Sequence, residues 1–246
     1  MKKMIVQIYE VQTPHEAEML IELGVDHIGS VILSQESWKN ADIRDTVKLV
    51  AQTDSRTSLI PLFSVPDAVF RVLDYYQPHI VHFCEDLSDS RRVKTLMQLH
   101  ENVRKKFPEI RIMRSIPIAR PCGFDRLTPQ RIPTLELARI FEPVSDYFLT
   151  DTVLEKQPVT GFVGITGKTC DGDTAKKLVE SSPIPVILAG GLSPENVSDA
   201  VKHVGPAGVD SCTGTNASDE EGHSVRFKKD TEKVRRFVEA VRKSEI

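Results

Sequence analysis

Short apolar segments alternate with longer amphipathic segments along the whole chain. Residues 4–9, 27–33, 58–63 and 80–84 are rich in apolar residues, many of them β-branched, which is typical of strands in a buried parallel sheet. The segments that follow, 13–23, 43–51, 66–76 and 88–106, carry apolar residues three and four positions apart. That spacing predicts helices with one buried face. The first half of the chain therefore predicts four strand–helix units.

The second half repeats the pattern. Strands are expected at 111–118, 147–151, 185–189 and 208–213, and helices at 134–141, 173–181, 193–204 and 229–243. Eight units without a linker or a shift in composition predict an α/β fold with one domain over residues 1–246, a single (β/α)8 TIM barrel. A doubly wound open sheet is the alternative, but no GxGxxG motif follows the first strand.

The junction after the seventh expected strand has a distinctive composition. Gly190 and Gly191 interrupt the apolar run, and Ser193, Pro194 and Glu195 have the composition of a helix start, with Ser193 as N-cap. A helix N-terminus presents free backbone N–H groups and positive potential, which suits a phosphate. An ordinary strand-to-helix turn has the same composition, so both interpretations stay open.

Overall composition narrows the partners. The chain has 246 residues, 40% of them hydrophobic, and a formal net charge of -3. Such a balance argues against a nucleic-acid partner, and no apolar run is long enough to span a membrane. Four cysteines without a CxxC pair favour a reducing compartment, so we expect a cytoplasmic monomer or homodimer.

Functional residues of such a barrel lie at the carboxyl ends of the strands. Alternate residues of a strand face the lumen, so an inward Asp151 implies an inward Leu149, and an inward Asp210 implies an inward Cys212. By the same reasoning two further pairs each share a face, namely His82 with Cys84 and Gln7 with Tyr9.

Three segments of the second half now resemble the phosphoribosylanthranilate isomerase family of tryptophan biosynthesis. They are LAGGLSPENV at 188–197, GITGKT at 164–169 and VDSCTG at 209–214. The first is similar to a signature of the family, and the second to its glycine-rich loop after the sixth strand. The likeness continues through the chain in strand order, but the first half shares only the order of strands and helices and not specific motifs.

The resemblance implies a TIM barrel without a cofactor that isomerises a phosphorylated ribose derivative. The family reaction opens a ribosylamine ring by protonating its oxygen and then removes a proton from the neighbouring carbon. Asp151 stands where the family has its general acid. The implied ligand and phosphate site comprises Gly167, Gly190, Gly191, Asp210, Cys212, Thr213 and Gly214.

The departures from the family concern the base. The family begins with KICG, whose cysteine is the general base, whereas this chain has Tyr9 followed by Glu10. An unperturbed phenol titrates near a pKa of about 10, so Tyr9 is a poor base. Cys84, Glu10 and His82 are the other candidates, although Cys84 equally fits a buried filler. The family's Arg after the second strand also has no match here.

Two further groups of residues have alternative interpretations. Four cysteines map to the same end of the barrel, but their spacing matches no zinc signature, so we expect no metal. Four arginines along the fifth strand and its loop either reach a second anionic group of the ligand or are solvated. The cysteines are Cys84, Cys122, Cys170 and Cys212, and the arginines are Arg114, Arg120, Arg126 and Arg131.

Two functions remain open from the sequence. The first is an isomerase-like enzyme on a phosphorylated sugar derivative, whose family reaction is altered or weak because Tyr9 replaces the base. The second is a barrel that binds a phosphorylated ligand without turning it over. In both, the partner is a phosphorylated small molecule.

Overall fold

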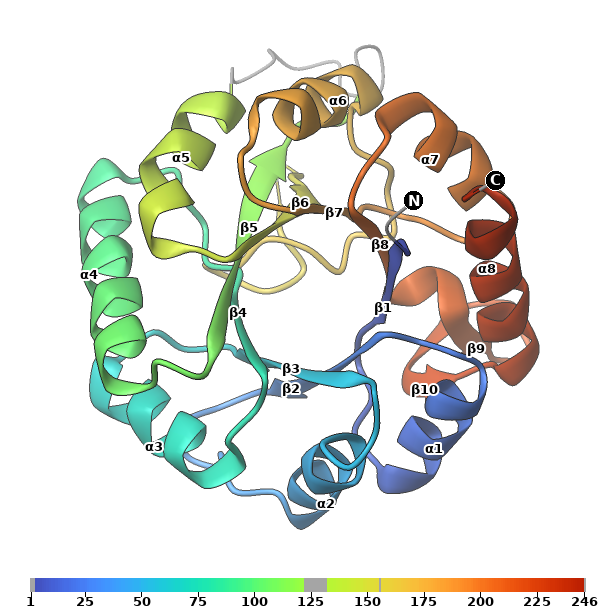
Figure 1. The fold of residues 1–246 in the computed structure, drawn as a ribbon, viewed down its shortest axis with the longest axis horizontal. Coiled ribbons are helices and arrows are strands. Elements are labelled where there is room, and N and C mark those ends of the chain that lie inside the picture. Colours follow the sequence, from blue (N-terminus) through green and yellow to red (C-terminus); the bar gives the residue numbers. More distant parts are fainter. Residues whose placement is uncertain (1–2, 122–131, 155, 246) are drawn as a thin grey trace.

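The computed structural model describes residues 3–121, 132–154 and 156–245. Eight parallel strands pair in chain order, and β1 pairs with β8 to close a barrel. The strands form an inner ring and the helices an outer ring (Figure 1). The (β/α)8 TIM-barrel prediction is confirmed, and the open-sheet alternative is wrong.

The elements follow the expected order. The strands are β1 (Ile5–Ile8), β2 (His27–Ile32), β3 (Arg56–Pro61), β4 (Ile80–Phe83), β5 (Arg111–Ile118), β6 (Tyr147–Thr152), β7 (Val186–Leu188) and β8 (Gly208–Ser211). The helices are α1 (Pro14–Glu22), α2 (Ala41–Val50), α3 (Pro66–Tyr76), α4 (Ser90–Lys106), α5 (Thr134–Phe141), α6 (Gly172–Ser181), α7 (Val197–Val204) and α8 (Thr231–Lys243). None of these helices is long and apolar enough to cross a membrane, as far as the described residues go.

Two apolar layers stabilise the barrel. The larger one fills the space between strands and helices, where helix residues such as Leu20, Val72 and Phe237 are fully buried. The smaller one lies inside the barrel and includes Ile80, Met113, Leu149 and Ile187. Alternation along each strand separates the two layers, because successive side chains point to opposite faces.

The helix after β7 begins later than its composition predicts. The α-helix starts at Val197 rather than at Ser193, so Ser193 is not its N-cap. Residues 193–196 form a separate turn, in which the Ser193 carbonyl accepts from the amides of Asn196 (3.2 Å) and Val197 (3.1 Å). The Asn196 side chain fastens this turn, donating to the Gly191 carbonyl at 3.0 Å and accepting from the Ser193 amide at 2.8 Å. The side-chain bonds of Asn196 therefore replace a simple cap.

A two-stranded hairpin between β8 and α8 was not predicted. β9 (Asn216–Ser218) and β10 (Ser224–Lys229) pair antiparallel and lie beside α1 and α8 (Figure 1). The hairpin displaces the start of α8 to Thr231, with Asp230 as its N-cap, so the helix does not begin at Lys229. Side chains of β10 alternate between partly buried and exposed, as expected for an edge ribbon.

The loop from β6 to α6 crosses the carboxyl ends of the strands. It begins after Thr152 and ends before Gly172. Residues 159–169 of it, the covering loop, pair with the segment after β4 through Val163 N–H to the Cys84 carbonyl (2.8 Å) and Asp86 N–H to the Gly161 carbonyl (2.9 Å). These bonds fix the covering loop over the barrel. The loop after β5, residues 119–132, lies largely outside the described residues.

A buried ion pair lies behind β5, on the helix side of the sheet. Arg114 and Glu85 are fully buried, with Nη1 and Oε2 2.5 Å apart, and the guanidinium lies over the Phe141 ring. We expect Arg114→Met to cost about 3–5 kcal/mol of unfolding free energy, because it leaves the Glu85 carboxylate unpaired.

Urea unfolding measures this effect, with Arg114→Met combined with Glu85→Leu as the matched control. The double variant removes both charges and is expected to lose less than the single one. A single variant as stable as the wild type would contradict the importance of the pair.

Candidate functional site

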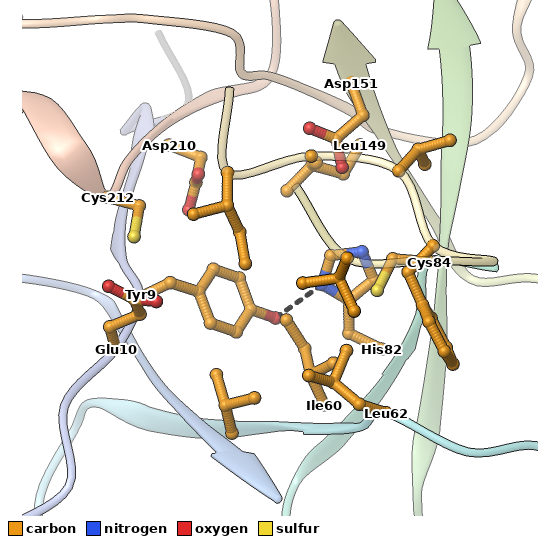
Figure 2. A pocket seen from close by; sticks show the side chains of 16 residues that line it. Tyr9, Glu10, Ile60, Leu62, His82, Cys84, Leu149, Asp151, Asp210 and Cys212 are labelled. Atoms are coloured by element: carbon orange, nitrogen blue, oxygen red, sulfur yellow. Dashed lines mark hydrogen bonds between the residues drawn. The ribbon is translucent and has the colours of Figure 1, made fainter. Parts of the chain in front are cut away.

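A pocket opens inside the barrel at the carboxyl ends of the strands. Figure 2 shows the 16 side chains that line it, with Tyr9 reaching across the middle and Asp151 and Asp210 on the opposite side. The remaining wall is mainly apolar, and the covering loop contributes part of it. Most of the predicted inward positions therefore line one cavity, as strand parity requires: Tyr9, His82, Cys84, Leu149, Asp151, Asp210 and Cys212.

Tyr9 is the central side chain of this pocket. Its ring is 4% exposed and occupies the space beside Gly29 of β2, where a Cβ atom would overlap it. Its phenolic oxygen is 2.5 Å from Ser58 Oγ and 2.8 Å from His82 Nδ1. Burial raises the pKa of Tyr9 well above its usual value of 10. The phenolate form of Tyr9 is therefore less populated at neutral pH than that of a free phenol, so Tyr9 is less available as a base.

Hydrogen bonds continue from His82 to the predicted acid. His82 Nε2 is 2.8 Å from Ser115 Oγ, and the Ser115 hydroxyl donates to Asp151 Oδ2 at 3.0 Å. His82 is buried, and desolvation, assisted by the nearby Arg114 charge, lowers its pKa to about 3. The imidazole is thus neutral at physiological pH and accepts a hydrogen bond on one nitrogen while donating from the other.

Asp151 has the environment of an acid. It lies at the end of β6, and burial raises its pKa from the usual 3.8 to about 7, against the opposing effects of the Ser115 hydrogen bond and the Arg114 charge. Gly164 of the covering loop lies directly over it, since a Cβ there would be 2.9 Å from both carboxyl oxygens. A carboxyl group with a pKa near neutrality retains a proton that it can donate.

Asp210 is a second carboxyl group with a raised pKa. It accepts from Gln7 Nε2 at 3.1 Å, and Gln7 Oε1 is in turn 3.1 Å from His27 Nδ1. Burial, with a smaller contribution from Asp151, raises the pKa of Asp210 to about 7 against the opposing effects of the Gln7 hydrogen bond and the Lys229 charge. Asp210 therefore lies in the lumen near Asp151, and its predicted role in ligand binding stays a prediction.

This raised pKa has a consequence for stability. The folded state holds a proton on Asp210 up to pH about 7, whereas the unfolded chain loses it near 3.8, so stability falls as pH rises through this range. We expect Asp210→Asn to stabilise the protein by about 4 kcal/mol at pH 8, and to change little at pH 4. Thermal unfolding at both pH values measures the difference. Equal shifts at the two pH values would contradict it.

Glu10 connects the pocket to the hairpin. It has a left-handed backbone with φ of 65°, and its buried carboxylate pairs through Oε1 with Arg226 of β10. Its Oε2 is buried in the pocket wall without a hydrogen-bond partner among the described residues. Glu10 therefore stays a candidate base, with one oxygen free to accept a proton.

The thiols are not activated. Burial is the main cause that raises the pKa of Cys84, Cys170 and Cys212, to about 12 in Cys170 and further from neutrality in Cys212. All three would be protonated at physiological pH, which disfavours Cys84 as a base. Among the described residues no three His, Cys, Asp or Glu side chains are placed to hold a metal ion, and Cys122 lies outside them.

Asp210 and Cys212 of the predicted ligand and phosphate site line the pocket, whereas its glycines converge beside the pocket. A Cβ atom at Gly191 would lie 2.8 Å from the Lys168 carbonyl carbon, and one at Gly167 would lie 3.4 Å from Thr213 Oγ1. A Cβ atom at Gly214 would overlap the carbonyl oxygen of Leu192. Three glycine-containing loops thus meet at van der Waals distance, which only residues without side chains permit.

The four arginines of the predicted second anionic site do not share one location. Arg114 is buried against the helices and paired with Glu85, so the expectation that it reaches a ligand is wrong. The reason is strand parity, because Arg114 lies between the inward Met113 and Ser115. Arg120 follows β5, and Arg126 and Arg131 lie outside the described residues.

Three residues of the site were not singled out in the sequence. Ser58 and Ser115 are fully or nearly fully buried on β3 and β5, and Arg226 lies on the unpredicted hairpin. Parity with Ile60 and Met113 places both serines in the lumen, but nothing in the sequence identifies their partners. The signal in the sequence that could have identified them is a small polar residue at an inward-facing position of a strand.

Comparisons with known proteins agree with this geometry. A family model described as N-(5'phosphoribosyl)anthranilate (PRA) isomerase matches residues 85–240. N-(5'-phosphoribosyl)anthranilate isomerase of Methanosarcina acetivorans is 28% identical over 242 residues, covering 96% of this chain and 92% of its own. The enzyme of that name from Haloferax volcanii is 43% identical over 108 residues, or 44% of this chain and 43% of its own.

Solved structures show the same fold. Phosphoribosyl anthranilate isomerase from Thermotoga maritima superposes with a TM-score of 0.67 at 19% identity, covering 98% of this chain and 99% of its own. The enzyme from Pyrococcus furiosus gives 0.65 at 19% identity, with coverage of 98% and 99%. Together with the family match over more than half of the chain, these findings confirm the predicted family. The chain belongs to the N-(5'-phosphoribosyl)anthranilate isomerase family.

Proposed function

We propose that this protein is an isomerase that opens the ring of a phosphorylated ribosylamine, with Asp151 as the general acid. The observation that carries the proposal is the Asp151 carboxyl group, which faces the pocket, lies under Gly164 and has a pKa raised to about 7. A group with this pKa both holds and releases a proton near neutral pH. Ring opening requires such a donor at the sugar oxygen.

The phosphate of the substrate would bind where the three glycine-containing loops meet. The backbones of Gly167, Gly191 and Gly214 are close enough there to surround a small anion once the covering loop adjusts. A solved phosphoribosyl anthranilate isomerase in complex with reduced 1-(o-carboxyphenylamino)-1-deoxyribulose 5-phosphate supports a phosphosugar as the ligand class. The sugar would extend from this site over Asp151.

The reaction is expected to be slow on the family substrate. A positioned general base contributes about 10²–10⁴ in rate, and Tyr9 replaces the cysteine that the family resemblance assigns to this role. The buried phenol also occupies part of the pocket in which the sugar would lie. The family reaction therefore persists weakly or on an altered substrate, in the chemistry of tryptophan biosynthesis or a related conversion.

A barrel that binds a phosphorylated ligand without turnover is the second candidate. The observation in its favour is that Tyr9 and Cys84 both have pKa values raised by burial, so that neither is a ready base. Calorimetry with ribose 5-phosphate tests binding, and a fluorescence assay with N-(5'-phosphoribosyl)anthranilate tests turnover. Binding without turnover of any ribosylamine phosphate would favour the second candidate. Absence of both binding and turnover would refute both candidates.

A further inference from the structure

Four side chains form an unbroken hydrogen-bonded chain across the floor of the pocket. It runs from Tyr9 through His82 and Ser115 to Asp151, with links of 2.8, 2.8 and 3.0 Å. Figure 2 shows the first link as a dashed line between the phenol and the imidazole. The chain joins the residue in the place of the missing base to the residue that acts as the acid.

The donors and acceptors of this chain fix its direction. The Ser115 hydroxyl donates to Asp151, so its oxygen accepts from His82 Nε2–H. The bare Nδ1 of His82 then accepts from the Tyr9 hydroxyl. The Tyr9 oxygen accepts from Ser58 and keeps one lone pair for a substrate proton.

We propose that His82 and Ser115 form a proton relay through which the Asp151 carboxylate, once it has protonated the substrate, accepts the proton that Tyr9 removes. This inference rests on the proposed function, because it assigns the base of that reaction. Tyr9 is the catalytic residue that contacts the substrate carbon. His82 and Ser115 are positioning residues that act through it.

The proton balance of one turnover closes within the enzyme. Asp151 gives its proton to the ring oxygen, and the ring C–O bond breaks with its electron pair on that oxygen. The substrate C–H proton passes to the Tyr9 oxygen, and its electron pair forms the enol double bond. Tyr9 gives its own proton to His82 Nδ1, His82 gives its Nε2 proton to Ser115, and Ser115 gives its proton to Asp151. As the enol becomes the ketone the shift reverses: Tyr9 gives a proton to the carbon that carries the nitrogen and regains one from His82 Nδ1, Ser115 returns a proton to His82 Nε2, and Asp151 returns one to Ser115. Asp151 then accepts the proton of the enol hydroxyl, so every group of the chain returns to its starting state.

The relay explains activity without an ionised base in the resting enzyme. His82 changes tautomer and never becomes an imidazolium, in agreement with its strongly lowered pKa. The uphill move is from a phenol with a pKa above 10 to a carboxylate with a pKa of about 7. Fewer than about one protein molecule in a thousand would hold Tyr9 as a phenolate at a given moment, so we expect slow turnover.

Several charged and titratable groups near Asp151 influence its titration. Arg114 of β5 lowers its pKa, while the interaction with Asp151 contributes to the raised pKa values of groups on four other elements. These are Tyr9 after β1, Cys84 after β4, Cys170 before α6 and Asp210 of β8. Only Asp210 among these four shares the range near pH 7, so Asp210→Asn is included in the titration below.

The kinetic test compares two buried serines: Ser115 is a member of the relay, and Ser58 is hydrogen-bonded to Tyr9 but is not a member. Ser115→Ala breaks the relay, and we expect kcat to fall by about 10²-fold or more with KM nearly unchanged. Ser58→Ala removes a hydrogen bond to Tyr9 outside the relay and should lower kcat less than about fivefold. Ser115→Thr should restore most of the activity. The wild type should show a solvent isotope effect that depends nonlinearly on deuterium fraction, and Ser115→Ala a linear one. Equal losses in the two alanine variants would overturn the relay.

A second test needs no substrate and separates the relay from the proposed function. In protein labelled with ¹⁵N-histidine, His82 should be entirely the Nε2–H tautomer at about pH 9, where Asp151 is ionised. At about pH 5 the neutral Asp151 can donate to Ser115, so the Nδ1–H tautomer should appear. Ser115→Ala and Asp151→Asn should abolish this change, while Ser58→Ala and Asp210→Asn should preserve it.

A tautomer independent of pH, or an unaltered response in Ser115→Ala, would overturn the relay even in an active enzyme. If the tautomer responds as expected but no ribosylamine phosphate is turned over, the proposed function fails and the proton-coupled chain stands. The two failures are therefore distinguishable.

Discussion

Asp151→Asn is expected to lower kcat by about 10³-fold, the largest effect of a single substitution on turnover. The amide has nearly the same shape and still accepts the Ser115 hydrogen bond, but it has no acidic proton for the ring oxygen. Substrate binding should change little, because the proposed phosphate site lies in other loops. Steady-state kinetics on the best ribosylamine phosphate measures both parameters.

The assignment of Asp151 as the acid also predicts how activity changes with pH. Asp151 must be protonated to act, and its pKa is raised to about 7, so kcat/KM should fall as pH rises above this value. Asp173→Asn, a change at an exposed carboxylate on α6, is the matched control and should keep the wild-type profile. An Asp151→Asn enzyme that retains more than a tenth of the activity would contradict the assignment of the acid.

Gly191→Asp is expected to abolish binding of phosphate and ribose 5-phosphate at millimolar concentration. Gly191 has φ of 58°, and a Cβ there would lie 2.8–3.0 Å from three backbone atoms of the covering loop, so any side chain forces the loop away. The new carboxylate also repels the anion. Titration calorimetry measures the loss.

The control for this substitution is Gly24→Asp. Gly24 also has a left-handed backbone, with φ of 79°, but no atom lies within 4 Å of a Cβ placed there. It shares the conformational strain and the added charge without the contact, so binding should persist. Wild-type binding by Gly191→Asp, or equal loss in both variants, would contradict a phosphate site at these glycines.

The fold was predictable because barrel and helix periodicities are strong and repeated. Each strand is a short apolar run and each helix has an apolar face, so the order of elements needs only local composition. The hairpin was missed because β9 and β10 are short and polar at the edge of the fold, and bury little. The start of α7 was misplaced because the Asn196 side chain makes bonds to Gly191 and Ser193 that composition does not reveal.

The site was predictable where a residue carries its own chemical signal. Asp151 and Asp210 are carboxylates at or near strand ends, and parity adds that each shares its face with one other residue, Leu149 or Cys212. Ser58 and Ser115 carry no such signal, because a buried serine has a role only through its partners, and those lie 49 and 36 residues away in the chain. The interpretation of Arg114 failed for the opposite reason, since its charge suggested a ligand while its position on β5 points it away from the lumen.

The most direct test of this account is kcat/KM of the wild type on N-(5'-phosphoribosyl)anthranilate, measured beside the Methanosarcina acetivorans relative. The central claim is that the barrel, the acid and the phosphate site persist while the family's base is replaced by Tyr9. We expect a value at least about 10²-fold below that of the relative. Tyr9→Cys combined with Glu10→Gly should raise it if the pocket still accepts the substrate. A wild-type value equal to that of the relative, with complementation of an auxotroph that lacks the isomerase, would contradict the claim.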